Sequence, residues 1–148
     1  MIIGTCDPEH DDARVLVEEL SDVLALITGA SGKASYSTDD ARVARSLFVV
    51  ARGEDGRMLG CGALRPLDGD VGEVKRMYAR PGTKGVGAAL LAYIEHEARA
   101  LGYRELWLET RRINTRAVAF YIGHGYVEMP NYGKYAGRPE AVCFRKTF

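Results

Sequence analysis

The hydrophobic pattern changes its period abruptly near the middle of the chain, at Pro81. Before this point, Val71 to Ala79 alternates with a period of two, which is typical of a β-strand. After it, Val86 to Leu101 carries apolar residues at intervals of three and four, which is typical of a helix with one buried face, and Gly102 is suited to end that helix. A further strand over Glu105 to Glu109 then predicts a strand–helix–strand crossover, in which the two strands lie parallel.

The segments on either side of this unit complete the predicted fold. Before it we expect helices over Asp11 to Gly29 and Thr38 to Arg45, then strands over Leu47 to Ala51 and Met58 to Arg65. After it we expect a helix over Asn114 to His124, then strands over Tyr126 to Met129 and Ala141 to Thr147. The order αα-βββ-α-β-α-ββ predicts one α/β layered domain over residues 1–148, with a mixed β-sheet flanked by helices.

The composition excludes several classes of partner. Acidic and basic residues number 20 each, whereas a nucleic-acid-binding protein needs a basic excess, so we expect no nucleic-acid partner. No apolar run approaches the roughly 18 residues of a membrane span, and no apolar stretch follows a basic start, so we expect no membrane partner and no signal peptide. The three cysteines are scattered and the three histidines lack ligand spacing, so we expect no metal, and reduced thiols favour a cytoplasmic location.

The strand before Pro81 carries an unusual number of charges for a buried strand. Its period of two predicts one face with Glu73, Lys75 and Met77, and the opposite face with Val74, Arg76 and Tyr78. Charges at mid-strand are uncommon in a core, so this strand is the predicted location of a functional site.

The glycine-containing turn at Lys84 to Ala89 is a candidate anion site. The first N–H groups of a helix have no partner within the helix, and the helix dipole is positive there. Glycines let an anionic group approach the backbone closely, although a glycine turn before a helix is also common as a purely structural feature. The order of residues differs from both the G-x-x-x-x-G-K-[ST] triphosphate loop and the G-x-G-x-x-G dinucleotide motif, so those two alternatives are excluded.

The same turn resembles the acetyl-CoA loop of the GCN5-related N-acetyltransferases, the GNAT superfamily. Lys84-Gly-Val-Gly-Ala-Ala89 is similar to the family pattern [Q/R]-x-x-G-x-[G/A], with lysine at its first position and a loop about two residues shorter after Pro81. The resemblance spans residues 48 to 128 and is carried also by Phe48-Val-Val-Ala51, Gly60-Cys-Gly-Ala63, Glu73-Val-Lys-Arg-Met-Tyr78, Leu108-Glu-Thr110 and Asn114-x-x-Ala117-x-x-x-Tyr121-x-x-x-Gly125-Tyr126. It implies the GNAT fold and transfer of an acetyl group from acetyl-CoA to an amine.

The resemblance also implies how acetyl-CoA binds. The pantetheine arm would add to the central strand like a further strand, and Asn114 would contact the cofactor while capping its helix. The backbone groups for the pantetheine would come from Met77, Tyr78 and Ala79, and those for the pyrophosphate from Lys84, Gly85, Val86, Gly87, Ala88 and Ala89.

Two residues match the catalytic positions of the family. Tyr121 matches the general acid that protonates the departing thiolate, and the alternative is a half-buried core tyrosine. Glu73 matches the general base that takes a proton from the attacking amine, and the alternative is an ion pair with Lys75 or Arg76. Glu109 is a second candidate for the base.

The sequence therefore predicts an N-acetyltransferase whose acceptor is a small-molecule or peptide amine that attacks the thioester directly. The balanced charge argues against a highly charged polymer as acceptor. A non-catalytic acyl-CoA-binding or sensing module is the alternative, although such a module need not retain Tyr121 and Glu73. The acceptor has no sequence signature, but Tyr132 and Tyr135 in the loop 130–139 are candidate lining residues of its pocket. A longer acyl donor stays open, and the resemblance allows a homodimer through the C-terminal strands.

Overall fold

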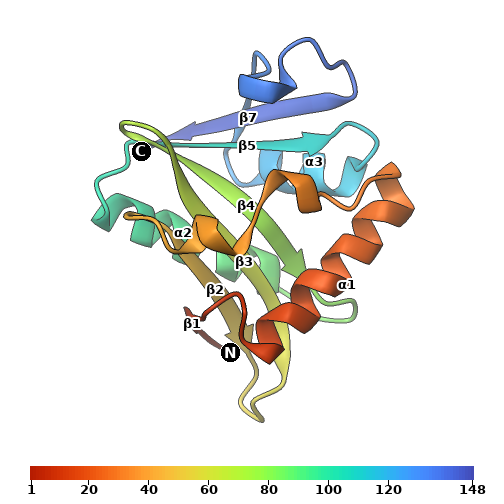
Figure 1. Ribbon diagram of the computed structural model, residues 1–148, viewed down its shortest axis with the longest axis vertical. Helices are drawn as coiled ribbons and strands as arrows, with labels where there is room; N and C mark the ends of the chain where they lie inside the picture. The colour runs from red at the N-terminus through yellow and green to blue at the C-terminus, as the bar shows by residue number, and fades with distance from the viewer.

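Seven strands form a single mixed sheet in the computed structural model, which describes residues 1–148 (Figure 1). The order across the sheet is β1-β2-β3-β4-β5-β7-β6, and only the β4–β5 pair is parallel. The strands are β1 (Ile2–Thr5), β2 (Leu47–Arg52), β3 (Met58–Asp68), β4 (Val71–Ala79), β5 (Glu105–Arg111), β6 (Val127–Met129) and β7 (Ala141–Thr147). The predicted α/β layered fold with a mixed sheet is confirmed.

Three helices cover the two faces of this sheet: α1 (Asp11–Thr28), α2 (Val86–Ala100) and α3 (Thr115–Gly123). Helix α1 crosses one face, where its buried residue Leu16 belongs to a cluster with Phe48 and Cys61. Helix α2 lies on the other face (Figure 1), where Leu90 belongs to the larger core cluster, which also contains Tyr121 from α3. The 3.6-residue period of each helix produces the single apolar face that each one buries.

Two parts of the predicted element order are wrong. The N-terminal strand β1 was not predicted, because it is a four-residue edge strand without an alternating pattern of buried side chains. The helix predicted over Thr38 to Arg45 is only a single 3₁₀ turn, Thr38–Ala41. Ser37 caps this turn in place of Thr38, and the chain reverses at Arg45, whose φ is 61°. A residue in the left-handed region cannot continue a helix.

A β-bulge at Arg76 changes which side chains of β4 face which helix. Ala63 of β3 pairs with Lys75, but Cys61 pairs with Tyr78, so β4 contains one extra residue. Arg76 has a φ of 54°, in the left-handed region. The predicted division of β4 into two faces is therefore wrong beyond Lys75.

The bulge moves Arg76, Met77 and Tyr78 to the opposite faces of the sheet from those that the period of two predicted. Arg76 and Tyr78 hydrogen-bond to Ser21 and Glu19 of α1, and so lie on the same face as Glu73 and Lys75. Met77 instead faces α2, close enough to Ile94 that a Cβ at Gly62 would overlap both side chains. Glu73, Lys75, Arg76 and Tyr78 therefore share one face of the sheet, and the last two contact α1.

Strands β4 and β5 separate after three pairs of residues. Val71, Gly72 and Glu73 pair with Glu105, Leu106 and Trp107, and no pairs follow. Beyond Glu73 the edge of β4 that faces β5 has no partner strand, whereas β5 stays paired with β7 along its whole length. This separation opens the sheet at its centre and positions the candidate site.

Candidate active site

Two adjoining cavities lie on the α1 face of the sheet, where β4 and β5 separate. The inner cavity, of about 140 Å³, lies between the separated strands and is lined by Val74 to Met77, Leu108 to Thr110 and Tyr121 among others. The outer cavity, of about 430 Å³, is lined by the segment 33–37, the loop 132–135 and polar side chains from β3 and β4. Ser35 and Tyr36 line both cavities, so the two are neighbouring compartments of one cleft.

Tyr121 reaches the inner cavity from α3, through the opening between the strands. Its ring packs edge-on against Tyr126 and is only 8 % exposed. Burial raises the pKa of the phenol above its ordinary value, and no partner within the protein hydrogen-bonds to it. Tyr121 therefore retains its proton throughout the physiological pH range, as a proton donor must.

Asn114 and Met77 line the inner cavity together with Tyr121. Asn114 is the N-cap of α3, and its side-chain oxygen accepts a hydrogen bond from the amide of Ala117 at 3.3 Å. The predicted cap is confirmed, and the side-chain amide nitrogen of Asn114 forms no bond within the protein.

Glu109 is the carboxylate of the inner cavity. Its side chain is only 10 % exposed and lies 3.2 Å from Nη1 of Arg111, but the geometry does not make a hydrogen bond. Burial raises the pKa of Glu109, and the positive charge of Arg111 opposes that rise. A buried carboxylate with a raised pKa is suited to accepting a proton.

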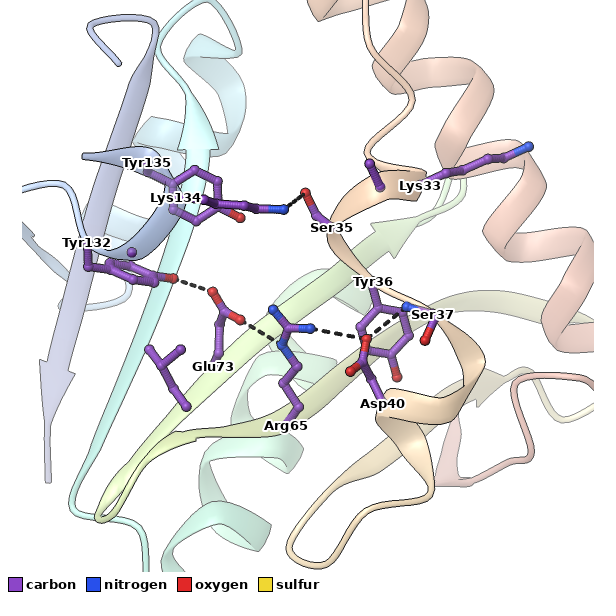
Figure 2. A pocket seen from close by; sticks show the side chains of 13 residues that line it. Lys33, Ser35, Tyr36, Ser37, Asp40, Arg65, Glu73, Tyr132, Lys134 and Tyr135 are labelled. Atoms are coloured by element: carbon purple, nitrogen blue, oxygen red, sulfur yellow. Dashed lines mark hydrogen bonds and ion pairs between the residues drawn. The ribbon is translucent and has the colours of Figure 1, made fainter. Parts of the chain in front are cut away.

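Glu73 lines the outer cavity, and both of its carboxylate oxygens accept hydrogen bonds (Figure 2). It is 1 % exposed, and its Oε1 accepts a hydrogen bond from Nε of Arg65, its cross-strand partner, at 2.8 Å. Its Oε2 accepts from the hydroxyl of Tyr132 and lies 3.9 Å from Nζ of Lys75. Arg65 in turn donates to Asp40 at 3.1 Å, so Glu73 belongs to a chain of ion pairs.

Lys75 stands at the boundary of the two cavities. Its ammonium donates a hydrogen bond to the hydroxyl of Tyr135 at 2.9 Å. Burial lowers the pKa of Lys75, an effect that the charge of Glu73 opposes. The sequence offered two ion-pair partners for Glu73, namely Lys75 and Arg76. The contact with Lys75 is present at 3.9 Å, whereas Arg76 donates instead to the hydroxyl of Ser21 and the backbone carbonyl of Ser31.

The start of α2 leaves several amide groups free. Gly85 is the N-cap with a φ of 71°, and it has no side chain to bond the first turn. The amides of Val86, Gly87 and Ala88 find no acceptor, and the first one to do so is Ala89, which donates to the carbonyl of Gly85. Free amides at a helix N-terminus are suited to bind an anion, which is the role that the sequence predicts for this turn.

The sequence missed several residues of the outer cavity. Tyr132 and Tyr135, the residues predicted to line the acceptor pocket, line this cavity, and the ring centroids of Tyr132 and Trp107 lie 5.1 Å apart. Arg65, Asp40 and Lys134 were not singled out, because each is a charged residue near a turn, where solvent exposure is the ordinary expectation. The cross-strand position of Arg65 opposite Glu73 was the one available signal, and it required the register of the hairpin.

Metal-ligand clusters, disulfides and membrane-spanning helices are absent from the structure. Among the side chains there is no group of three or more His, Cys, Asp and Glu residues with the spacing of metal ligands. All three cysteines are free thiols. None of the helices combines the length and the apolar character that a membrane crossing requires.

The chain matches a family model and a curated relative over most of its length. The model of the acetyltransferase (GNAT) family matches residues 17–126. A protein of Azospirillum brasilense named IAA acetyltransferase is 33 % identical over 142 residues, which cover 94 % of this chain and 92 % of the relative.

Solved structures with the same fold lie at lower identity. An acetyltransferase of the GNAT family from Staphylococcus aureus Mu50 aligns with a TM-score of 0.79 and 14 % identity, covering 99 % of each chain. An aminoglycoside 6'-N-acetyltransferase, determined in complex with coenzyme A, aligns with a TM-score of 0.67 and 19 % identity, covering 99 % of this chain and 97 % of that one. The family match, the curated relative and the shared fold agree: this chain is a member of the GNAT acetyltransferase family.

Proposed function

We propose that this protein transfers an acetyl group from acetyl-CoA to the amine of a small-molecule acceptor, in the cleft between β4 and β5. The observation that carries the proposal is the inner cavity, where a protonated phenol, a buried carboxylate and an unpaired strand edge meet. These are the donor, the acceptor and the backbone surface that amine acetylation from a thioester needs.

The cofactor would bind along β4 and across the start of α2. The free amides of Val86, Gly87 and Ala88 would hold the pyrophosphate, with the exposed Lys84 adding positive charge beside it. The backbone of Met77 to Ala79 would bond the pantetheine arm by adding it to the open strand edge. Asn114, whose side-chain amide nitrogen is free, lines the inner cavity together with Met77. Support for this cofactor comes from the family and from the coenzyme A complex of the related fold.

Tyr121 would act as the general acid. The attacking amine forms a C–N bond with the acetyl carbon, the C–S bond breaks, and the thiolate of CoA takes a proton from the phenol of Tyr121. The raised pKa of Tyr121 suits this role, since the phenol stays protonated until the thiolate forms.

A carboxylate would accept the proton that the amine loses. Glu73 was the first candidate from the sequence, but both of its oxygens are already bonded, to Arg65 and to Tyr132. Glu109 lines the inner cavity together with Tyr121; its Oε2 is ion-paired with Arg111 but accepts no hydrogen bond. We therefore assign the proton-accepting role to Glu109, and to Glu73 the positioning of Arg65 and Tyr132 in the outer cavity.

Calorimetric titration tests the proposal first. Acetyl-CoA should bind saturably to the wild-type protein and to Tyr121→Phe, and a Lys84→Ala, Gly87→Glu variant should lose binding because a carboxylate would occupy the phosphate position. Thiol release with a panel of amines, and with IAA because a relative is named for it, should then detect turnover by the wild type alone.

The two steps separate the enzyme from a binding module. Binding of acetyl-CoA without turnover by any acceptor would favour a non-catalytic acyl-CoA-binding module. Absence of binding at millimolar acetyl-CoA would overturn the proposal.

A further inference from the structure

The outer cavity contains the polar residues that meet the acceptor, and their pairing indicates which acceptor fits. We propose that the acceptor carries an anionic group, such as a carboxylate, in addition to its amine, and that Lys134 and Arg65 bind that group. The proposal rests on the proposed function, since it describes the acceptor of the same reaction.

The carboxylates around the cleft are all neutralised by cations of the protein. Asp40 pairs with Nη1 of Arg65 at 3.1 Å and also accepts a hydrogen bond from the amide of Ser37. Glu73 pairs with Nε of Arg65 and lies 3.9 Å from Lys75. Glu109 pairs with Arg111. No carboxylate is left to attract the extra ammonium groups of a polyamine or an aminoglycoside.

Among the cations that line the outer cavity, Lys134 is the one without an acidic partner. Its Nζ donates a hydrogen bond to the hydroxyl of Ser35 at 2.9 Å, and no carboxylate lies within 4 Å of it. It projects across the mouth of the outer cavity, from the loop before β7 toward the segment after α1 (Figure 2). The remaining lysine of the lining, Lys33, pairs with Glu18 and extends away from the cavity toward α1 (Figure 2).

Arg65 contributes a second free donor group. Its Nε and Nη1 are bonded to Glu73 and Asp40, but its Nη2 has no acceptor in the protein. The guanidinium is held in one orientation by its two carboxylates, so the free Nη2 is fixed in the cavity wall (Figure 2). A fixed guanidinium nitrogen and an unpaired ammonium on one cavity suit a carboxylate, because charge-assisted hydrogen bonds are the stronger kind.

The shape of the cleft is consistent with a small acceptor bound in this way. The outer cavity has the size of a small-molecule site, about 430 Å³ against a usual range of roughly 300–1,000 Å³, and aromatic rings of Tyr36, Tyr132 and Tyr135 line it. Because Ser35 and Tyr36 also line the inner cavity, an acceptor with its anion at Lys134 can extend its amine past them toward Tyr121.

Matched acceptors test the proposal. Each of the common L-amino acids would be compared with its α-amide and its decarboxylated amine, together with spermidine and kanamycin, by thiol release at saturating acetyl-CoA. We expect turnover among the amino acids, with kcat/KM at least tenfold lower for the matched amide or amine of each accepted compound. An accepted amide or polycation that equals or exceeds the amino acids, or the absence of any anionic acceptor, would overturn the proposal.

Variants at the two lysines of the lining identify the binding group. Lys134→Ala should raise KM for the anionic acceptor about tenfold, with little change for its amide, and Lys134→Arg should restore most of the loss. Lys33→Ala is the matched control, because its charge is already neutralised by Glu18. Equal losses for the acid and the amide in Lys134→Ala would mean that Lys134 only supports the loop, and would contradict its role.

Acetyl-CoA titration of the same variants separates this proposal from the proposed function. If the proteins bind acetyl-CoA but do not prefer anionic acceptors, only the proposed acceptor class is wrong. If the wild type does not bind acetyl-CoA, the proposed function and the proposed acceptor class are both wrong.

Discussion

The two cavities of the cleft differ in how their polar groups are satisfied. In the outer cavity Glu73, Arg65, Asp40 and Tyr132 form a continuous chain of hydrogen bonds, which leaves Nη2 of Arg65 free. In the inner cavity the hydroxyl of Tyr121 forms no hydrogen bond within the protein, and Oε2 of Glu109 is buried without a hydrogen bond, 3.2 Å from Nη1 of Arg111. A buried polar group without a partner costs about 1–3 kcal/mol, so its presence in a stable fold calls for an explanation.

This difference separates binding from chemistry within one site. A continuous network of hydrogen bonds holds its members in fixed positions, which suits recognition of an acceptor. Unbonded groups are free to exchange protons with a substrate, which suits the reaction itself. If this interpretation is correct, substitutions in the two cavities will affect different kinetic and thermodynamic quantities.

The largest effect is expected at Tyr121. Tyr121→Phe removes only the hydroxyl, which forms no bond in the protein, so the fold and acetyl-CoA binding should be retained. The thiolate loses its proton donor, and kcat should fall by about 100-fold or more. Single-turnover kinetics and calorimetry together measure both quantities. A fall of less than threefold would leave Tyr121 as a core residue and would remove the main distinction between the cavities.

Glu109→Gln should reduce kcat/KM by about tenfold to 100-fold at neutral pH, because the amide cannot accept the proton of the amine. The ionised form of Glu109 is the active one, so wild-type activity should rise with pH through its pKa, which burial raises. The variant should lose this part of the pH profile, and its deficit should shrink at alkaline pH, where more of the amine is already unprotonated. If the activity of Glu109→Gln still rises with pH as that of the wild type does, a group other than Glu109 accepts the proton of the amine.

Glu73→Gln should act mainly on stability. The amide loses the charge that Arg65 and Tyr132 bond to, in a position that is 1 % exposed, and the free energy of unfolding should fall by about 1–3 kcal/mol. Asp40→Asn, in the same chain but 29 % exposed, is the matched control and should cost less. Urea denaturation measures both. If Glu73→Gln has the same free energy of unfolding as the wild type but its activity no longer rises with pH, Glu73 is the base and the assignment to Glu109 is wrong.

The sequence predicted the inner cavity better than the outer one, for a physical reason. The inner cavity and the start of α2 contain strong local signals, namely the Asn114 cap and the helix that carries Tyr121 in the first, and the glycines Gly85 and Gly87 in the second. These signals depend on backbone conformation over a few residues, and the sequence contains them directly.

The outer cavity depends on contacts between distant segments. Tyr132 meets Glu73 across 59 positions of the chain and Lys134 meets Ser35 across 99, and no local pattern encodes such pairs. The bulge at Arg76 had a similar effect, because one extra residue in β4 moved Arg76 and Tyr78 to the α1 face. Periodicity assumes an unbroken alternation, and it therefore assigned Met77 to the wrong face.

The smallest effect is expected at Lys84, at the cofactor end of the cleft. Lys84 is exposed in the turn before α2, where the free amides of the first turn supply most of the anion site. Lys84→Ala should weaken acetyl-CoA binding only about two- to fivefold, because a screened charge at a helix terminus contributes about 0.3–1 kcal/mol. Calorimetry at low and high salt measures it, and the difference from the wild type should shrink at high salt. KM for the acceptor should not change, since Lys84 lines neither cavity. A large loss would mean that the shortened loop depends on this one side chain rather than on its backbone, and the amides would then be too far from the phosphates to bind them.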